Sequence, residues 1–310
     1  MLSPFENTMI NYSIIIPHKN IPHLLQRCLD SIPVRDDIQV IIVDDNSNPD
    51  IVDFNSFPGF DRDNVECIFN KESRGAGYAR NKGIDLARGE WLIFVDSDDF
   101  FSANINSILD EYIESDADLL FFDYKTVYSD DITQLSDRSN IYHTYIEKYI
   151  SDGSAEYELR YCFYPIWGKI IRRSFVDFYR IRCSEVRWSN DVYFSLLVGF
   201  YAHKMHVSNK ILFVITQRGN SLTNASCKTN EELHTRLSEA LKSECFLKKN
   251  SIEVKKKESL FYLRILYQMN GLKWFLKDCF AQPPFSLTFN SMCRYLGLIF
   301  VEKFKLLIGL

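Results

Sequence analysis

Short apolar runs alternate with amphipathic stretches through the first 128 residues. Five runs have the composition of buried strands: Tyr12–Ile16, Ile38–Val43, Val65–Phe69, Trp91–Val95 and Leu119–Tyr124. Between them, apolar residues recur at helical spacing after Pro22, from Gly75 to about Ala87, and around Ile105–Ile113. Strands that alternate with such helices are typical of βαβ units. The pattern predicts an α/β fold, with a mostly parallel sheet flanked by helices on both faces.

This alternation is lost in residues 129–160, which are polar and aromatic. Beyond them, the pattern predicts a strand or turn followed by a short helix in Tyr164–Val176, a helix at Asn190–Tyr201 and a strand at Ile211–Thr216. From about residue 230 the pattern is helical, with a break at Pro283 and Pro284. We therefore expect a main domain over residues 1–227, with halves at about 12–128 and 129–227, and a helical C-terminal extension over residues 228–310.

The composition is that of a folded protein, with 46% hydrophobic and 15% aromatic residues among 310. Its eight cysteines include no C-x-x-C pair and no zinc spacing, which predicts reduced thiols in a cytoplasmic protein. No basic segment followed by an apolar core opens the chain, and no run approaches 18 uncharged apolar residues. We therefore expect neither a signal peptide nor a spanning helix.

The net charge of −5 conceals an asymmetry between the two predicted parts. Residues 1–227 carry 22 Lys and Arg against 33 Asp and Glu, whereas residues 228–310 carry 14 against 8. A basic region indicates an anionic partner, and the apolar and lysine pattern of Tyr295–Leu310 suits the surface of an anionic membrane. The alternative is a helical layer packed on the main domain. No zinc finger, RNP-like motif or compact Arg-rich patch indicates a nucleic-acid partner.

Acidic residues follow two of the predicted strands. Asp44 and Asp45 end the second strand, and Asp96, Asp98 and Asp99 follow the fourth. Parallel strands end on the same side of a sheet, so we expect both groups on one rim, where open α/β sheets bind ligands. Crowded carboxylates repel one another unless a cation lies among them, and their oxygens suit Mg²⁺ or Mn²⁺. For each group alone, the alternative is a polar turn that caps the next helix.

Basic residues and glycines lie between the two acidic turns. Arg74, Arg80 and Lys82 are candidates to neutralise a diphosphate, the alternative being a solvated helix face. Gly75 and Gly77 are spaced as in a dinucleotide fingerprint, but Arg80 stands where the third glycine is needed, and the motif does not follow the first strand. A Walker A loop is also absent. These departures disfavour a hydride-transfer enzyme.

Four segments in this order resemble family 2 glycosyltransferases. They are Ser13–Pro17 followed by Asn20, Val43–Ser47, Gly75–Gly83, and Val95–Asp99, which is similar to the D-x-D signature of that family. The resemblance covers about residues 12–128. It implies a GT-A fold and an inverting transfer of a sugar from a nucleotide donor. The nucleotide would bind to the half at about 12–128 and the acceptor to the half at about 129–227.

The resemblance also implies roles for single residues. Asp45 would contact the nucleobase, Arg80 the nucleotide or its phosphates, and Asp96 the region of the ribose and the metal. Asp98 would ligate Mg²⁺ or Mn²⁺ together with Asp96, and the metal would offset charge on the departing nucleoside diphosphate. The expected nucleotide-sugar site comprises Pro17, Asp44, Asp45, Arg80 and Asp96.

An inverting transfer needs a base on the face of the sugar opposite the leaving group. The family carries this base in a Glu-Asp pair at a helix start, after a Trp-x-Lys segment. Here Trp167–Lys169 precedes Asn190 and Asp191, so Asn190 replaces the Glu and Asp191 keeps the position of the base. Ser189 or Asn190 is the expected cap of that helix. The alternative makes Asp191 a first-turn acid favoured by the helix dipole.

Two reserve candidates are Glu185, as a base, and Arg218, for the diphosphate. Together these features predict a metal-dependent inverting glycosyltransferase of surface polysaccharide synthesis, cytoplasmic or peripheral on the inner face of the cell membrane. The expected donor is a UDP-sugar, because UDP is common in the family, and the expected acceptor is a saccharide or a lipid-linked saccharide. The rival is a non-catalytic nucleotide-sugar-binding or scaffold relative, which we would expect to lack Asp98 or Asp191.

Overall fold

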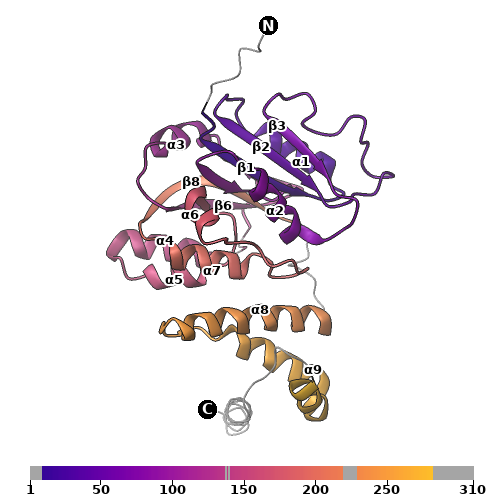
Figure 1. Cartoon of the computed structure of the whole chain (residues 1–310), viewed down its shortest axis with the longest axis vertical. Helices are drawn as coiled ribbons and strands as arrows, with labels where there is room; N and C mark the ends of the chain where they lie inside the picture. Colours follow the sequence, from indigo (N-terminus) through magenta and orange to yellow (C-terminus); the bar gives the residue numbers. More distant parts are fainter. Residues whose placement is uncertain (1–8, 137, 139, 219–228, 282–310) are drawn as a thin grey trace. The chain divides into compact units, whose positions relative to one another are not determined.

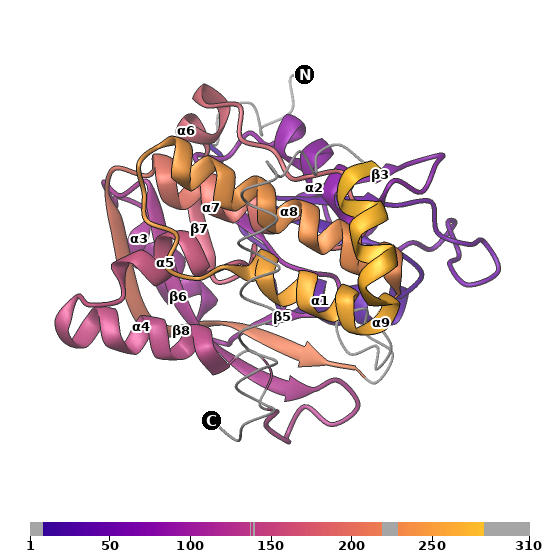
Figure 2. The same ribbon diagram turned by 90° about the horizontal axis from the view of Figure 1, so that it is seen from below.

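A computed structural model describes residues 9–136, 138, 140–218 and 229–281. The chain divides into two compact units, Met1–Ser226 and Cys227–Leu310. A mixed sheet forms the centre of the first unit (Figures 1 and 2). Within the described residues it has eight strands in the order β3-β2-β1-β4-β7-β6-β8-β5. The strands are β1 Tyr12–His18, β2 Ile38–Asp44, β3 Val65–Phe69, β4 Trp91–Phe94, β5 Phe100–Phe101, β6 Leu119–Tyr128, β7 Lys169–Arg172 and β8 Met205–Gln217.

The parallel strands β1, β2 and β4 lie at the centre because their side chains are apolar on both faces. Ile14 pairs with Val40 on one side and with Ile93 on the other, and all three are 0% exposed. Helix α2 (Gly75–Leu86) packs on β1 and β2. Gly83 permits this close approach, since a Cβ atom there would lie 2.4 Å from Ile15. The tightly packed centre holds the strand ends in fixed positions.

The remaining helices of the first unit surround this sheet. They are α1 Pro22–Asp30, α3 Ile105–Tyr112, α4 Asn140–Asp152, α5 Glu156–Cys162, α6 Arg173–Phe178 and α7 Val192–Tyr201. Figure 1 shows α4, α5 and α7 gathered on one side of the sheet. The predicted helices of the first 128 residues are confirmed, as is a short strand followed by a helix within Tyr164–Val176.

Three features of the sheet differ from the expected pattern. Strand β7 runs antiparallel to both β4 and β6, and β5 runs antiparallel to β8. Strand β8 begins at Met205, well before the predicted Ile211, because it pairs along the whole of β6. Residues 129–160, where the alternation of the sequence pattern is lost, contain α4 and most of α5, and aromatic rings of this region pack on the core. The ring centroids of Tyr142 and Phe163, for example, lie 4.8 Å apart.

The second unit contains the helices α8 (Asn230–Lys249) and α9 (Glu258–Ala281), which pack on each other through leucines. Thr229 caps α8, since its side chain accepts a hydrogen bond of 3.1 Å from the backbone N–H of Glu232. Among the described helices, none combines the length and the apolar character needed to cross a bilayer. The predicted break at Pro283 and Pro284 and the segment Tyr295–Leu310 lie outside the described residues.

Candidate active site

The carboxyl ends of β1, β2 and β4 form one rim of the sheet. Asp44 ends β2 beside His18, which ends β1, and Asp96 follows β4 by two residues. Pro17 is a buried member of β1, paired with Val43. Because the three strands are parallel, both acidic turns leave the sheet on the same side. The structure thus brings the two predicted acidic groups to one rim.

The carboxylate of Asp44 points into the protein. It accepts hydrogen bonds from the backbone N–H of Ser47 at 2.8 Å and from the Ser47 hydroxyl at 2.5 Å. His18 Nδ1 lies 2.8 Å from the same carboxylate, while the backbone N–H of Ile21 donates to His18 Nε2. The proton of the imidazole is therefore on Nδ1, and that N–H donates to Asp44. Burial opposes ionisation, but these hydrogen bonds hold the pKa of Asp44 below its usual value. Asp44 was predicted to bind the nucleotide sugar, but its contacts lie within the protein and tie the two strand ends together.

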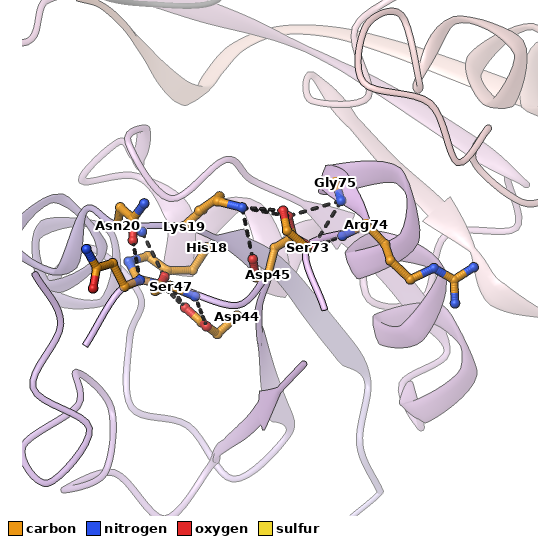
Figure 3. Close-up of polar contacts among 10 residues, drawn as sticks. His18, Lys19, Asn20, Asp44, Asp45, Ser47, Ser73, Arg74 and Gly75 are labelled. Atoms are coloured by element: carbon orange, nitrogen blue, oxygen red, sulfur yellow. Dashed lines mark hydrogen bonds and ion pairs between the residues drawn. The ribbon is translucent and has the colours of Figure 1, made fainter. Parts of the chain in front are cut away.

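Asp45, the next residue, faces the start of α2 (Figure 3). Its carboxylate accepts hydrogen bonds from the backbone N–H of Arg74 at 2.7 Å and of Gly75 at 3.0 Å. The Ser73 hydroxyl donates to it at 2.9 Å, and Lys19 Nζ lies 3.4 Å away. Gly75 has a φ of +85°, a conformation that a side chain would strain. The glycine at this position thus lets the first turn of α2 present two N–H groups to Asp45.

Asp96, Asp98 and Asp99 form a compact cluster after β4. One carboxylate oxygen from each lies within 4.8 Å of the others. The cluster is anchored from behind by β8, since the backbone N–H of Thr216 donates to Asp99 at 2.7 Å. Burial and mutual repulsion raise the pKa of Asp98, and that of Asp99 well above its usual value. Three carboxylates this close fit a hard divalent cation, because its charge would relieve the repulsion that they otherwise exert. Asp99 belongs to the cluster, although only Asp96 and Asp98 were predicted as metal ligands.

Arg80 joins this cluster to the predicted base. Its guanidinium is forked: Nη2 lies 2.6 Å from Asp96 Oδ1, and Nη1 donates to Asn190 Oδ1 at 2.5 Å. Arg80 is 4% exposed, so its side of both contacts is shielded from water, whereas the Asp96 side chain is 33% exposed. Burial alone would lower the pKa of Arg80, but the carboxylates of Asp96 and Asp191 raise it. Arg80 therefore holds a permanent positive charge between residues that are 94 positions apart in the sequence.

Asp191 lies directly before α7, one residue after the asparagine that Arg80 binds. It occupies the N-cap position, but its side chain makes no capping hydrogen bond. Helix α7 begins at Val192 and its N-cap is Asp191. The prediction that Ser189 or Asn190 caps this helix was therefore wrong. Burial raises the pKa of Asp191, and the charge of Arg80 partly offsets this effect. Asp191 is thus a partly buried carboxylate with a raised pKa, and a raised pKa makes it a stronger base than an exposed aspartate.

The Trp-x-Lys segment supports the start of α7 from beneath. Lys169 is 1% exposed, and its ammonium donates to the carbonyl oxygens of Phe163 (2.9 Å) and Pro165 and to the Ser195 hydroxyl (3.2 Å). Burial lowers the pKa of Lys169 to about 7. The backbone N–H of Ser195 in turn donates to the carbonyl oxygen of Asp191 at 2.9 Å. Lys169 thus fixes the first turn of the helix that carries Asp191.

Close packing of α2 against residues 183–190 sets the distance between the two halves of the site. A Cβ atom at Gly77 would lie 2.1 Å from the carbonyl oxygen of Ser184, so only glycine fits there. Asn81 adds two hydrogen bonds to the backbone of Cys183, at 2.8 and 3.0 Å. The glycine pattern that excluded a dinucleotide fingerprint therefore serves this contact.

The other basic candidates have protein partners in this structure. Arg74 pairs with Glu185 at 2.6 Å and lies over the ring of Tyr78 at 3.8 Å. Arg218 pairs with Asp98 at 2.7 Å. Glu185, the fallback base, is exposed and is held by Arg74. Arg218 was predicted to reach a diphosphate. In this structure its guanidinium contacts Asp98, the predicted metal ligand, so it lies at the acid cluster.

Several residues of the site carry no signal in the sequence. Arg27 on α1 donates to the carbonyl oxygen of Asp98 at 2.6 Å, and Ser73 and Lys19 close around Asp45. These are ordinary polar residues in helices and loops, and only the tertiary fold brings them to the acids. Asp99, in contrast, could have been predicted as a third member of the acid cluster, since it directly follows the D-x-D pair.

Comparison with known proteins identifies the family. Residues 13–177, more than half of the chain, match the family described as glycosyl transferase family 2. The chain belongs to this family. It is 28% identical to the Bacillus subtilis (strain 168) glycosyltransferase EpsH over 206 residues, which cover 62% of this chain and 57% of EpsH. It is also 34% identical over 126 residues to a poly(ribitol-phosphate) beta-glucosyltransferase of Bacillus spizizenii, covering 39% of this chain and 18% of that protein.

A solved structure confirms the predicted GT-A fold. The structure of S. aureus TarS 1-349 in complex with UDP-GlcNAc superposes with a TM-score of 0.58 at 19% identity, covering 90% of this chain and 76% of that chain. The family 2 member described here spans 57% and 65% of the lengths of its relatives EpsH and EpsJ. Its fold and family are thus those implied by the four sequence motifs.

Proposed function

We propose that this family 2 protein is a metal-dependent, inverting glycosyltransferase that transfers a sugar from a UDP-sugar to a saccharide or lipid-linked saccharide acceptor. The observation that carries the proposal is the fork of Arg80, which joins Asp96 of the acid cluster to Asn190, directly before Asp191. This link supports a cation site and a general base that belong to one active site. The UDP-GlcNAc bound to TarS supports this donor class, and the poly(ribitol-phosphate) beta-glucosyltransferase among the relatives supports a role in surface polysaccharide synthesis.

In this proposal Asp191 acts as the general base. Its carboxylate takes the proton of the acceptor hydroxyl while the hydroxyl oxygen bonds to the anomeric carbon. The bond from that carbon to the β-phosphate oxygen breaks on the opposite face, and its electron pair leaves with the nucleoside diphosphate. Configuration at the anomeric carbon is thereby inverted. The raised pKa of Asp191 makes this proton transfer more favourable than it would be for an exposed aspartate.

Asp96 and Asp98 are the proposed ligands of Mg²⁺ or Mn²⁺, with Asp99 directly behind them. When bound, such a cation offsets negative charge on the departing diphosphate. Arg80 and Arg218 pair with these ligands and add fixed positive charge on the same side of the site. Asp45 and the first turn of α2 form the proposed nucleobase end, and Pro17 and Asp44 shape the strand ends beneath it.

The experiment measures donor binding and turnover separately in Asp191→Asn. Calorimetry with UDP and Mn²⁺ is expected to give wild-type affinity, because Asp191 does not contact the nucleotide in this proposal. Release of UDP from UDP-GlcNAc, or from another UDP-sugar that binds, is expected to fall about a hundredfold or more, the usual contribution of a general base. Glu185→Gln is the matched control, since it removes the neighbouring exposed carboxylate and is expected to retain turnover.

The rival, a non-catalytic nucleotide-sugar-binding relative, makes a different prediction. It requires UDP binding without turnover in the wild-type protein, and no difference between the Asp191 and Glu185 variants. Loss of turnover in Glu185→Gln together with normal turnover in Asp191→Asn would instead assign the base to Glu185.

A further inference from the structure

A polar link crosses the ends of β1 and β2 in front of Asp45 (Figure 3). Lys19 Nζ donates to the backbone carbonyl of Asp45 at 3.2 Å, contacts its Oδ2 at 3.4 Å, and is bonded to the Ser73 hydroxyl. The Lys19 side chain is 43% exposed, whereas that of Asp45 is only 6% exposed. The Lys19 ammonium is therefore more accessible to a ligand from solvent than the carboxylate that it contacts.

The carboxylate of Asp45 has no spare capacity while this link is closed. A carboxylate offers about four lone-pair sites. The backbone N–H groups of Arg74 and Gly75, the Ser73 hydroxyl and Lys19 already donate to its two oxygens. A ligand N–H can bind only if one of these donors leaves. The Lys19 contact is the longest of them, at the outer limit of a hydrogen bond, and belongs to an exposed side chain.

The backbone around Lys19 is held in place, so the ammonium moves only through the torsions of its side chain. On one side, His18 is tied to Asp44. On the other, Asn20 has a φ of 58°, its backbone N–H donates to the Ser47 hydroxyl at 2.8 Å, and its side-chain oxygen accepts from the backbone N–H of Asn48 at 2.7 Å. Only the side-chain torsions of Lys19 remain adjustable. A change of rotamer can therefore release the Asp45 carboxylate while Lys19 remains within side-chain reach of it.

We propose that Lys19 determines nucleobase specificity together with Asp45. The ammonium of Lys19 donates to a ring carbonyl of the base, while Asp45 Oδ2 accepts the adjacent ring N–H. Uracil and guanine carry a ring N–H next to a carbonyl, whereas cytosine and adenine present an amino donor beside an unprotonated ring nitrogen at the same edge. The pair therefore selects an imide-type edge and rejects an amino-type edge. This inference rests on the proposed function, because it assigns the nucleobase of the donor to the Asp45 end of the site.

The test measures the affinities of UDP, GDP, CDP and ADP by calorimetry at a fixed Mg²⁺ concentration. In the wild-type protein, UDP or GDP is expected to bind more tightly than CDP and ADP, and the tighter of the two identifies the base. Lys19→Met is expected to reduce the preference for that nucleotide over CDP about tenfold, the worth of one charge-assisted hydrogen bond. Lys19→Arg keeps the donor and is expected to restore most of the preference. Lys71→Met removes an exposed positive charge two residues before Ser73, and is expected to leave the preference unchanged.

Two results would overturn the role of Lys19 while leaving the proposed function intact. One is an unchanged preference in a folded Lys19→Met variant. The other is tighter binding of UDP to that variant, which would mean that Lys19 only competes with the ligand for the Asp45 carboxylate. Failure of the wild-type protein to bind any of the four diphosphates would instead overturn the proposed function, and the specificity role with it.

Discussion

Replacing Arg80 with methionine tests whether its charge couples the acid cluster to the base. Arg80→Met keeps the apolar stem of this buried side chain and removes the guanidinium. Arg80→Lys keeps the positive charge but loses the planar fork that contacts Asp96 and Asn190 together. The pair of variants therefore separates the effect of the charge from the effect of the geometry.

The expected loss of stability follows from the two contacts. Hydrogen bonds to charged groups contribute about 1.5–3 kcal/mol each. The carboxylate of Asp96 is 33% exposed, so water replaces part of what Arg80 supplies there. We therefore expect Arg80→Met to lower the free energy of unfolding by about 2–3 kcal/mol in total. For a domain of this size, that corresponds to a decrease in Tm of about 4–12 °C. Arg80→Lys should lower the free energy of unfolding by about half as much as Arg80→Met does.

The pH dependence gives a sharper readout. The charge of Arg80 lowers the pKa of Asp191, against the larger effect of burial, which raises it. Removing that charge is expected to raise the pKa of Asp191 further, so the acid limb of UDP release moves to higher pH in Arg80→Met. In Arg80→Lys the limb should stay close to that of the wild type. Initial rates of UDP release, measured from about pH 5 to pH 9, provide the comparison. Identical acid limbs in all three proteins would refute the electrostatic coupling.

Four further predictions follow from other contacts of the site and the tail. Asp98→Asn should abolish the extra rise in Tm that Mn²⁺ adds to UDP, while UDP alone still stabilises the protein; an undiminished effect of Mn²⁺ would place the ion elsewhere. Lys169→Met leaves the carbonyl oxygen of Phe163 without its donor and that of Pro165 with only the Ser195 hydroxyl, and should lower the free energy of unfolding by about 2–4 kcal/mol in urea titrations. If Asp191 is the general base, turnover should fall as pH falls through its raised pKa, with an acid limb above the usual range near 4. If residues 228–310 dock on a membrane, deleting residues 290–310 should weaken binding to anionic vesicles in a flotation assay, and unchanged flotation would favour a helical layer.

The strand ends that carry the acids were predictable because the local sequence determines them. Strands β1, β2 and β4 are short, mostly apolar runs followed by polar turns, and burial on both faces leaves little ambiguity. Strand β7 and the helix α4 were harder to place. The four residues of β7 are buried between β4 and β6, and α4 is held by the packing of aromatic rings, so tertiary contacts rather than local propensity determine both.

The acidic pairs show the same limit at the level of single side chains. Asp44 and Asp45 are adjacent in the sequence, and successive side chains at a strand end point in opposite directions. One of them binds His18 and Ser47 inside the protein, and the other faces the start of α2. The sequence predicts that the two aspartates lie at the strand end, but not which of them turns into the protein and which turns toward α2. The link from Arg80 to Asn190 is likewise hidden, because 110 residues separate its two ends.

A crystal structure of the protein with UDP and Mn²⁺ tests the central claim most directly. The anomalous signal of manganese locates the ion without reference to the protein atoms. We expect the ion between the carboxylates of Asp96 and Asp98 and the diphosphate of UDP. The uracil ring is expected at Asp45, and the side of the diphosphate that would carry the sugar is expected to face Asp191. An ion bound away from Asp98, or a UDP molecule whose diphosphate lies on the far side of Asp191, would contradict the account.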